Sequence, residues 1–201
     1  MAKRLLDVLF SSLLMLILLP FLCLLALVVR VNLGKPILFS QIRPGIYGRP
    51  FRMFKFRTMT DACDENGNLL ADTMRITKTG KWLRATSLDE LPELFNVLKG
   101  EMSLVGPRPL LMSYLELYNH RQATRNNVKP GLTGWAQIKG RNSISWDEKL
   151  ELDAWYVENR SFWLDLKILA KTIVYVLKRD GINHGEGVTM PFFTGSSKKE
   201  Q

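Results

Sequence analysis

The chain has 201 residues, which is enough for one domain with a hydrophobic core but too few for two domains of ordinary size. Its two cysteines, Cys23 and Cys63, exclude a disulfide-stabilised scaffold, and no cysteine or histidine has the spacing of a zinc site. The net charge of +9 would suit nucleic acid. We nevertheless expect no nucleic-acid partner, because the sequence contains no helix-turn-helix, RNA-binding aromatic signature or zinc-finger spacing.

The positive charge is concentrated at the N-terminal end. The first 60 residues contain nine bases and a single acid, Asp7. These bases flank residues 8–29, a run of 22 residues without a charge. A basic side chain next to an apolar segment is attracted to anionic lipid by about 1 kcal/mol. The N-terminal third is therefore expected to bind membrane lipids.

The apolar run has three interpretations. A signal peptide would need a small-residue cleavage site after its apolar core, and none follows. A spanning helix is long enough and would tolerate a kink at Pro20. However, bases on both sides give it no preferred orientation, and Pro20 removes a backbone hydrogen bond near its middle. We favour a helix over residues 1–34 that is broken at Pro20 and returns to the same membrane face, with the spanning helix as the open alternative.

The elements that follow are predicted from residue patterns. Two short runs rich in aromatic and branched residues flank a turn-rich connection, which is typical of a β-hairpin. Later segments show helical spacing of apolar residues or lie between turn signals. In chain order, we expect hairpin strands at 36–41 and 51–58, a helix at 87–99, a turn at 106–109, a helix at 111–125, a strand at 135–139, and helices at 146–158 and 162–179.

The last of these helices is amphipathic. Lys167, Lys171 and Lys178 fall on one side of it, opposite aromatic and aliphatic residues. This pattern suits a helix lying in a membrane interface, and equally a solvated face over an ordinary core.

Together these elements predict an α+β fold that is mainly helical, with a small hairpin or sheet and interfacial amphipathic helices. We expect a membrane helix at 1–34, a catalytic domain at 35–180, and a loop with a flexible tail at 181–201.

The segment from Ser87 to Pro92 is the strongest candidate for a site. Ser87 and Glu90 have the spacing of a capping box, which would start a helix at Leu88 and place Asp89 in its first turn. A helix N-terminus favours an anion, so adjacent carboxylates there can bind Mg²⁺ and a diphosphate together. Acids in a first turn are also common for stability alone. Pro92 fits poorly inside such a helix, and a later helix start would leave both acids on a turn.

Several cations accompany these acids. Pro107 and Pro109 stiffen the backbone around Arg108, which lowers the entropy cost of a bidentate phosphate contact. Cations at Gly/Pro-rich turns, together with paired acids and a membrane segment, favour phosphoryl chemistry over ordinary surface charge. Walker A and kinase catalytic motifs are absent from the sequence. The candidate cations are Lys55, Arg57, Arg84, Arg108 and Arg141.

Six ordered blocks resemble the bacterial sugar transferase family, and specifically its small PglC-type members, the monotopic phosphoglycosyl transferases. The resemblance extends from the apolar run to about residue 179. The blocks are Lys55-Phe-Arg-Thr-Met59, Ser87-Leu-Asp-Glu-Leu-Pro92, Asn96-Val-Leu-Lys-Gly100, Met102-Ser-Leu-Val-Gly-Pro-Arg-Pro109, Lys129-Pro-Gly-Leu-Thr-Gly134 and Gly140-Arg-Asn142.

The resemblance implies an enzyme at the cytoplasmic face of the bacterial inner membrane. Such enzymes begin glycan assembly, including that of lipopolysaccharide and exopolysaccharide. They transfer a sugar phosphate from a UDP-sugar to a polyprenyl phosphate such as undecaprenyl phosphate, using Mg²⁺ and releasing UMP. Which sugar, polyprenol and glycan are used, and whether the chain forms a homo-oligomer, stay open at this stage.

The resemblance also implies roles for residues. The family's catalytic and metal-binding dyad matches Asp89 and Glu90, with the aspartate forming a covalent intermediate. The family's membrane helix breaks at a Ser-Pro pair, and here the pair is Leu19-Pro20. The residues expected to line the substrate site are Lys55, Arg84, Arg108, Arg141 and Asp153.

Two alternatives to covalent transfer are considered. In the first, Asp89 and Glu90 only bind Mg²⁺ and the transfer takes a single step. In the second, the chain is a non-catalytic adaptor that binds anionic lipid through its basic N-terminal third.

Overall fold

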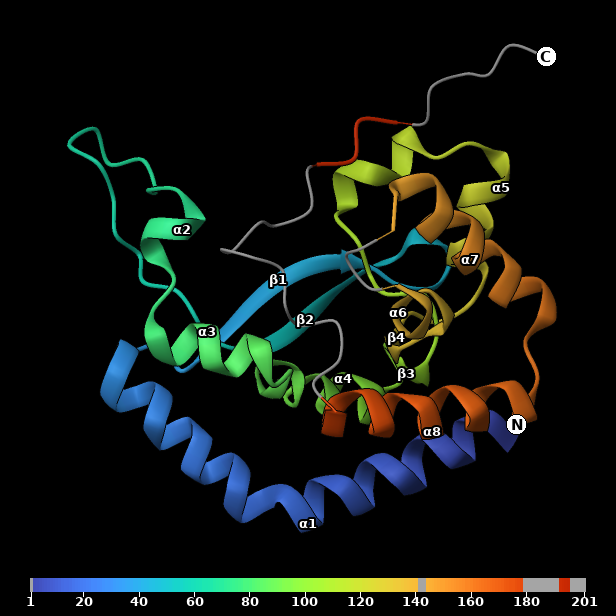
Figure 1. Cartoon of the computed structure of the whole chain (residues 1–201), viewed down its shortest axis with the longest axis horizontal. Coiled ribbons are helices and arrows are strands. Elements are labelled where there is room, and N and C mark those ends of the chain that lie inside the picture. The colour runs from blue at the N-terminus through green and yellow to red at the C-terminus, as the bar shows by residue number, and fades with distance from the viewer. Residues whose placement is uncertain (1, 141–143, 179–191, 196–201) are drawn as a thin grey trace.

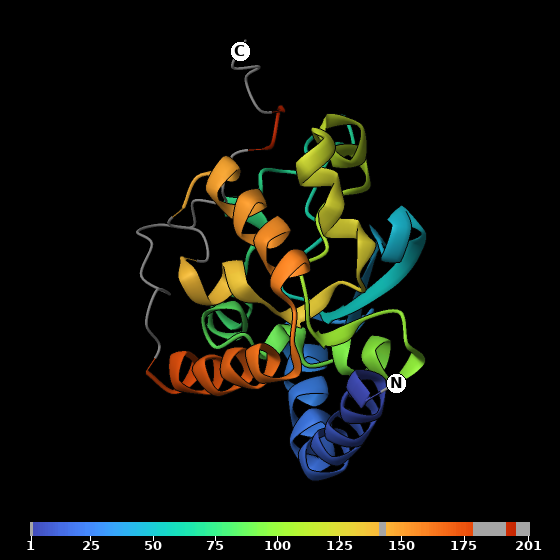
Figure 2. The same cartoon turned by 90° about the vertical axis from the view of Figure 1, so that its right-hand side faces the viewer.

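The structure is a computed structural model that describes residues 2–140, 144–178 and 192–195. It confirms the predicted α+β fold, which is mainly helical (Figures 1 and 2). The helices and strands, with 3₁₀ helices labelled η, are α1 (Ala2–Leu33), β1 (Leu38–Pro44), η1 (Ile46–Gly48), β2 (Pro50–Phe56), α2 (Asp72–Arg75), α3 (Lys78–Ala85), η2 (Leu88–Glu90), α4 (Glu93–Lys99), β3 (Ser103–Val105), η3 (Met112–Leu117), α5 (His120–Ala123), η4 (Thr124–Asn127), β4 (Gly131–Thr133), α6 (Trp135–Lys139), α7 (Trp146–Asn159) and α8 (Phe162–Lys178).

Helix α1 is bent but not broken. The chain stays α-helical through Pro20, so the predicted loss of helical structure there is wrong. Proline can be accommodated by bending, because the one missing hydrogen bond need not end the helix. In Figure 1 the helix bows away from the rest of the chain in the middle, and both of its ends approach it.

Polar side chains fix the first two turns of α1 to the rest of the molecule. Asp7 is 3% exposed and accepts a hydrogen bond from the N–H of Leu104 at 3.0 Å. Lys3 donates to the carbonyl of Val105, also at 3.0 Å. Arg4 donates to two carbonyls at the C-terminal end of α4. The N-terminal end of α1 is therefore joined directly to α4 and β3.

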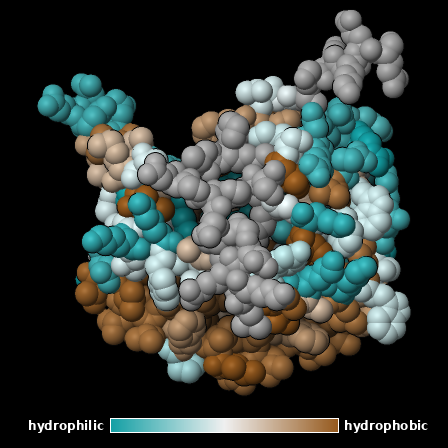
Figure 3. Space-filling view, in the orientation of Figure 1, coloured by the Kyte–Doolittle hydropathy of each residue, from teal (hydrophilic) through white to brown (hydrophobic). Residues whose placement is uncertain are grey.

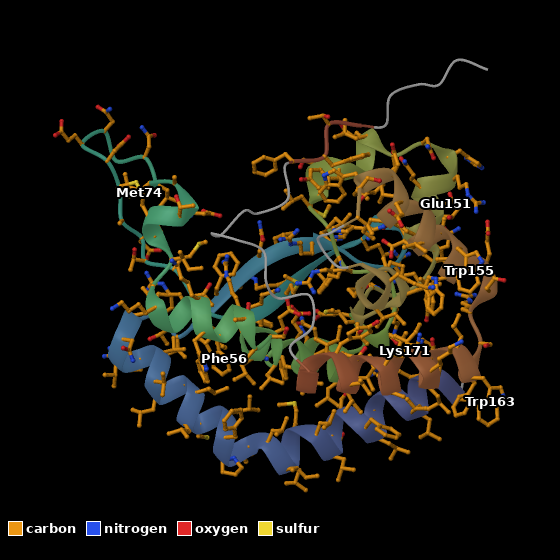
Figure 4. The ribbon with its side chains drawn as sticks, in the orientation of Figure 1. Phe56, Met74, Glu151, Trp155, Trp163 and Lys171 are labelled. Carbon is orange, nitrogen blue, oxygen red and sulfur yellow. The ribbon has the colours of Figure 1, made fainter. Side chains whose placement is uncertain are left out.

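The other end of α1 packs in a hydrophobic cluster. Leu25 and Val29 are buried there against Phe56 of β2 and Leu83 of α3. Phe56 is labelled in Figure 4, above the left-hand arm of α1. Both ends of α1 consequently contact the same folded body.

Between its ends, α1 exposes apolar side chains. Leu16 is 72% exposed and Ile17 is 62% exposed. Within the described residues, α1 is the one helix long and apolar enough to cross a membrane, and only 11% of its most apolar stretch is buried. Figure 3 shows the resulting hydrophobic band along the lower edge of the molecule. Such a large exposed apolar surface marks contact with a membrane or a partner, rather than an ordinary core helix.

The predicted hairpin is confirmed. Strands β1 and β2 pair antiparallel, with Leu38 opposite Phe56 at one end and Pro44 opposite Pro50 at the other. Residues from β2, α4, β3, α7 and α8 form the main hydrophobic core, which includes Met53, Leu94, Val97, Met102, Leu104, Tyr156 and Ile168.

The predicted strand at 135–139 is wrong, because these residues form helix α6. The strand of this region is β4, which begins four residues earlier in the chain, and it pairs in parallel with β3. Its three residues are too few to show alternation. A Cβ on Gly131 would lie 2.0 Å from the backbone nitrogen of Gly106, so glycine is required where the two strands meet.

The predicted continuous helix at 111–125 is also wrong. The segment is divided into η3, α5 and η4, with extended backbone at Tyr118. Asn119 then starts α5 with a capping box completed by Gln122.

The last two predicted helices, α7 and α8, are confirmed. Lys167 and Lys171 are exposed on α8, and Lys171 is labelled in Figure 4. The side chain of Lys178 lies outside the described part of the chain.

Candidate active site

The two acids at the centre of the site lie on a single turn. They belong to the 3₁₀ helix η2, and α4 begins only at Glu93, directly after Pro92. The predicted capping box is wrong, because Ser87 is in the left-handed region with φ 56° and its side chain caps nothing. The alternative of a later helix start is confirmed. Proline is tolerated at the beginning of a helix but not inside it.

Asp89 has a buried and uncommitted carboxylate. The residue is 7% exposed, and its carboxylate makes no hydrogen bond or ion pair with the residues that the structure describes. Burial and the negative charge of Glu90 raise the pKa of Asp89 to about 6, against the opposing charges of Lys55, Arg108 and Arg84. The carboxylate can therefore ionise near neutral pH while staying free to bind or attack.

Glu90 is engaged by two cations. Arg108 contacts both of its carboxylate oxygens, through Nη1 to Oε2 at 3.1 Å and through Nη2 to Oε1. Lys55 Nζ lies 2.7 Å from Oε1. Burial alone would raise the pKa of Glu90, but the charges of Arg108 and Lys55 outweigh it and keep the pKa well below its usual range. Glu90 is therefore ionised and fixes both cations beside Asp89.

Arg84 completes the group of cations around the acids. It lies at the end of α3, is exposed, and donates through Nε to the hydroxyl of Thr58 at 3.0 Å. Its charge also lowers the pKa of Asp89, as a smaller effect. Three of the predicted substrate-binding residues, Lys55, Arg84 and Arg108, thus surround the acid pair.

Arg57 has a structural position instead. It is buried and donates to the carbonyls of Leu33, Lys35 and Met59. It therefore joins the end of α1 to the end of β2, and its side-chain hydrogen bonds within the described residues include neither acid of the pair.

The two remaining predicted residues are placed differently. Asp153 is 2% exposed on α7 and forms an ion pair with Arg125, with Nη2 and Oδ2 2.8 Å apart. Oδ2 of its carboxylate is thus engaged by Arg125, and its place in a substrate site stays a prediction. Arg141 lies outside the described residues.

Glu93 is a third acid of the site, one that the sequence analysis did not identify. It is 1% exposed, and its Oε1 lies 3.2 Å from Lys55 Nζ. Burial, and then the charge of Glu90, raise the pKa of Glu93 to about 7. Its position three residues after Glu90, on the same side of a helical turn, was the available signal.

The residues present fit Mg²⁺ only together with a phosphate ligand. Asp89 offers a free carboxylate, which is a hard oxygen donor, whereas Glu90 is committed to Lys55 and Arg108. Within the described residues, no group of three or more histidine, cysteine, aspartate or glutamate side chains could hold a metal. Mg²⁺ is commonly bound by one or two carboxylates plus substrate phosphates.

The arrangement is suited to phosphoryl chemistry. The Asp89 carboxylate, which has no partner among the described residues, lies beside cations that can balance the charge of a diphosphate. The bent apolar helix α1 belongs to the same folded body. No sequence motif or geometry in the described residues indicates nucleoside triphosphate hydrolysis.

Comparison with known proteins agrees with these features. Residues 1–179 match the family model described as bacterial sugar transferase. An uncharacterized sugar transferase of Bacillus subtilis, EpsL, is 61% identical over 169 residues, or 84% of each chain. The UDP-glucose:undecaprenyl-phosphate glucose-1-phosphate transferase of Klebsiella pneumoniae is 41% identical over 85% of this chain and 39% of its own. The undecaprenyl-phosphate galactose phosphotransferase of Salmonella typhimurium is 39% identical over 89% of this chain and 41% of its own.

Proposed function

This chain belongs to the bacterial sugar transferase family, and we propose that it transfers a sugar 1-phosphate from a UDP-sugar to a polyprenyl phosphate. The observation that carries the proposal is the free carboxylate of Asp89 beside cations fixed by Glu90. The resulting polyprenyl diphosphate sugar would begin assembly of a bacterial glycan.

The names of the relatives support the same substrates. Those of Klebsiella pneumoniae and Salmonella typhimurium are named for transfer involving undecaprenyl phosphate, with glucose and galactose respectively. This chain spans about two fifths of the length of either relative. It matches their shared segment, and the transfer of their activity to it is part of the proposal.

The proposed reaction has two steps at one phosphorus atom. A carboxylate oxygen of Asp89 attacks the sugar-bearing phosphorus of the UDP-sugar, and the bond from that phosphorus to the bridging oxygen breaks, so that UMP leaves. A phosphate oxygen of the polyprenyl phosphate then attacks the same phosphorus. The bond to Asp89 breaks, which restores the carboxylate and yields the polyprenyl diphosphate sugar.

The cations make the first step electrostatically feasible. An ionised carboxylate and an anionic diphosphate repel each other, so positive charge must offset this repulsion as they approach. Lys55, Arg84 and Arg108 are placed to provide it. Mg²⁺, bound through Asp89 with Glu90 nearby, would neutralise charge on the diphosphate. Glu90 would keep Lys55 and Arg108 oriented toward Asp89.

The exposed apolar helix α1 supports a site at the lipid surface. Both ends of α1 contact the same body, so we propose that it enters the cytoplasmic leaflet and returns to the cytoplasmic face of the inner membrane. The bases of the N-terminal third would meet anionic lipid there. A site at this depth can use a lipid-bound acceptor without extracting it from the membrane.

The most informative test of this function is a screen for UMP release. The purified chain is incubated with undecaprenyl phosphate, Mg²⁺ and each member of a panel of UDP-sugars. We expect UMP and a lipid-linked sugar diphosphate with at least one donor. No UMP with any donor, from a chain shown to be folded, would contradict the proposed function.

A second measurement separates covalent from single-step transfer. The chain is mixed with a radiolabelled donor in the absence of polyprenyl phosphate, quenched with acid, and digested. Covalent transfer predicts label on the peptide that contains Asp89. An active enzyme that never carries label would support single-step transfer instead.

A further inference from the structure

We propose that Arg125 and Asp153 form a buried device that positions Arg108, the arginine that binds Glu90. The inference rests on the proposed function for its kinetic consequence. Its structural basis is a set of contacts that join η4, α7 and the turn at residues 106–109.

The backbone and side chain of Arg108 contact different groups. Its guanidinium binds Glu90, whereas its carbonyl accepts a hydrogen bond from Arg125 Nη2 at 2.6 Å. The side chain of Arg108 is 39% exposed, and packing alone therefore does not fix it. Pro109 restricts the φ and ψ of Arg108, which precedes it, and the bond to the Arg108 carbonyl fixes the orientation of the peptide that follows.

Arg125 uses its whole guanidinium in this arrangement. The side chain is 2% exposed. Nε and Nη2 donate to Asp153 Oδ2 at 3.1 and 2.8 Å, and Nη1 donates to the hydroxyl of Tyr118 at 3.0 Å. The planar guanidinium of Arg125 thus has one orientation in which it binds both Asp153 and Tyr118. In this orientation Nη2 also reaches the carbonyl of Arg108.

Stability alone is a poor explanation for the buried ion pair of Arg125 and Asp153. Removing two charges from water is costly, and a buried ion pair is often no more stabilising than apolar side chains of similar size. What apolar side chains cannot supply is the hydrogen bond to the carbonyl of Arg108. Asp153 is 2% exposed and two nitrogens of Arg125 donate to its Oδ2, so the role proposed for it is exerted through Arg125.

The experiment compares kinetics in two backgrounds. Arg125→Lys keeps the charge opposite Asp153 but loses the fork, and a small displacement of a charged group in a site can lower kcat by about 100-fold. We expect such a loss in the otherwise unchanged enzyme. In an Arg108→Ala background the same change should lower kcat by less than about threefold, because no guanidinium is left to position. An equal loss in both backgrounds would indicate a merely structural role and overturn the proposal.

A second variant addresses folding. Arg125→Met combined with Asp153→Leu replaces the pair by apolar side chains and is expected to fold, since neither charge is left unpaired. Its kcat should fall as far as that of Arg125→Lys. A folded double variant with wild-type kcat would also overturn the proposal.

Arg121 provides a matched control. It too binds a carboxylate of α7, with Nε 2.9 Å from Glu151 Oε1, but both side chains are about half exposed. Glu151 lies near the outer edge of the molecule in Figure 4, far from α1. Arg121→Lys should leave kcat and KM unchanged.

Amide hydrogen exchange tests the positioning without any substrate. In Arg125→Lys we expect faster exchange at residues 104–110, and no change in Arg121→Lys. Unchanged exchange in this turn would overturn the positioning role whether or not the chain turns over a UDP-sugar. Absence of UMP release from the wild-type chain would instead reject the proposed function alone.

Discussion

Asp89 and Glu90 are neighbours in the chain, yet their carboxylates have opposite surroundings. Glu90 is bound by Lys55 and Arg108, and Asp89 has no partner among the described residues. The pKa of Asp89 is raised to about 6 by burial and the charge of Glu90, and that of Glu90 is lowered by the two cations against the effect of burial. Two adjacent acids with separated pKa values are suited to different tasks. Here one can react and the other can orient cations.

The third acid of the site gives a prediction on stability and pH. Burial and the charge of Glu90 raise the pKa of Glu93 from 4.5 to about 7. As the pH rises from 4.5 to about 7, Glu93 loses its proton in the unfolded chain but keeps it in the folded chain. Glu93 therefore lowers the free energy of unfolding by up to about 1.4 kcal/mol for each pH unit in this range. Glu93→Gln cannot titrate. The variant should therefore gain stability relative to the wild type as the pH rises from 5 to 7.

Unfolding in detergent, without donor or divalent ions, measures this difference. Glu65→Gln, an exposed loop acid changed in the same way, serves as the control and should follow the wild type at every pH. A stability difference between Glu93→Gln and wild type that is constant from pH 5 to pH 7 would contradict the assigned shift.

The sequence predicted most of this site but not all of it. Asp89, Glu90, Lys55 and Arg108 belong to short motifs whose residue types already indicate phosphoryl chemistry, and the fold brings them together with Arg84, which lies outside those motifs. Asp153 was assigned to the substrate site, but its contact with an arginine 28 residues away depends on how α7 packs. Glu93 and Arg125 were missed for a similar reason. A buried charge is recognised by its partners, and these come from distant parts of the chain.

At the scale of elements, the segment at 192–195 packs against the rest of the molecule through the aromatic side chain of Phe193. Phe193 is 4% exposed, its ring lies 5.6 Å from that of Tyr114 and 5.5 Å from that of Trp146, and its N–H donates to the hydroxyl of Tyr114. The ring of Tyr118 also lies 5.9 Å from that of Phe193, and the Tyr118 hydroxyl accepts a hydrogen bond from Arg125. The segment therefore packs against Tyr118, whose hydroxyl binds Arg125, and Arg125 in turn binds the carbonyl of Arg108.

Phe193→Ala should lower the free energy of unfolding by about 3 kcal/mol, because a large buried ring is removed from an aromatic cluster. The neighbouring Phe192 is 77% exposed, and Phe192→Ala should change it by less than about 0.5 kcal/mol. Denaturant unfolding of both variants checks the difference. Equal effects of the two changes would mean that the segment does not dock as described.

Helices α7 and α8 and the β-hairpin were predicted correctly, whereas the helix at 111–125 and the strand at 135–139 were not. Helices α7 and α8 carry enough turns for their spacing to be visible, and the hairpin has strong turn signals. Strand β4 has only three residues, and the first is a glycine, so it is too short to show a strand pattern in the sequence. The helix predicted at 87–99 begins later in the chain, at Glu93, and Pro92 was the residue that indicated this start.

At the scale of the molecule, α1 is part of the folded core at both ends. Asp7 binds β3 near its N-terminal end, and Val29 packs against Leu83 near the other. A straight spanning helix would place these ends on opposite sides of a bilayer about 30 Å thick, and one set of contacts would be lost. The bent helix keeps both sets and exposes the apolar residues around Pro20.

Topology can be measured in sealed inverted vesicles that carry tags at both ends of the chain. We predict that protease removes both tags at similar rates, because both ends lie on the cytoplasmic face. A soluble protein sealed inside the vesicles confirms their integrity. Protection of one tag and loss of the other would support the spanning helix and contradict the re-entrant one.

The central claim is that the Asp89 carboxylate attacks the sugar-bearing phosphorus. Asp89→Asn keeps the shape of this side chain and removes its nucleophilic charge, and Asp64→Asn makes the same change in an exposed turn. The most direct measurement is UMP release by both variants from UDP-sugar and undecaprenyl phosphate. The account predicts a loss of about 10³-fold or more for Asp89→Asn and wild-type rates for Asp64→Asn. Turnover by Asp89→Asn within tenfold of the wild type would contradict it.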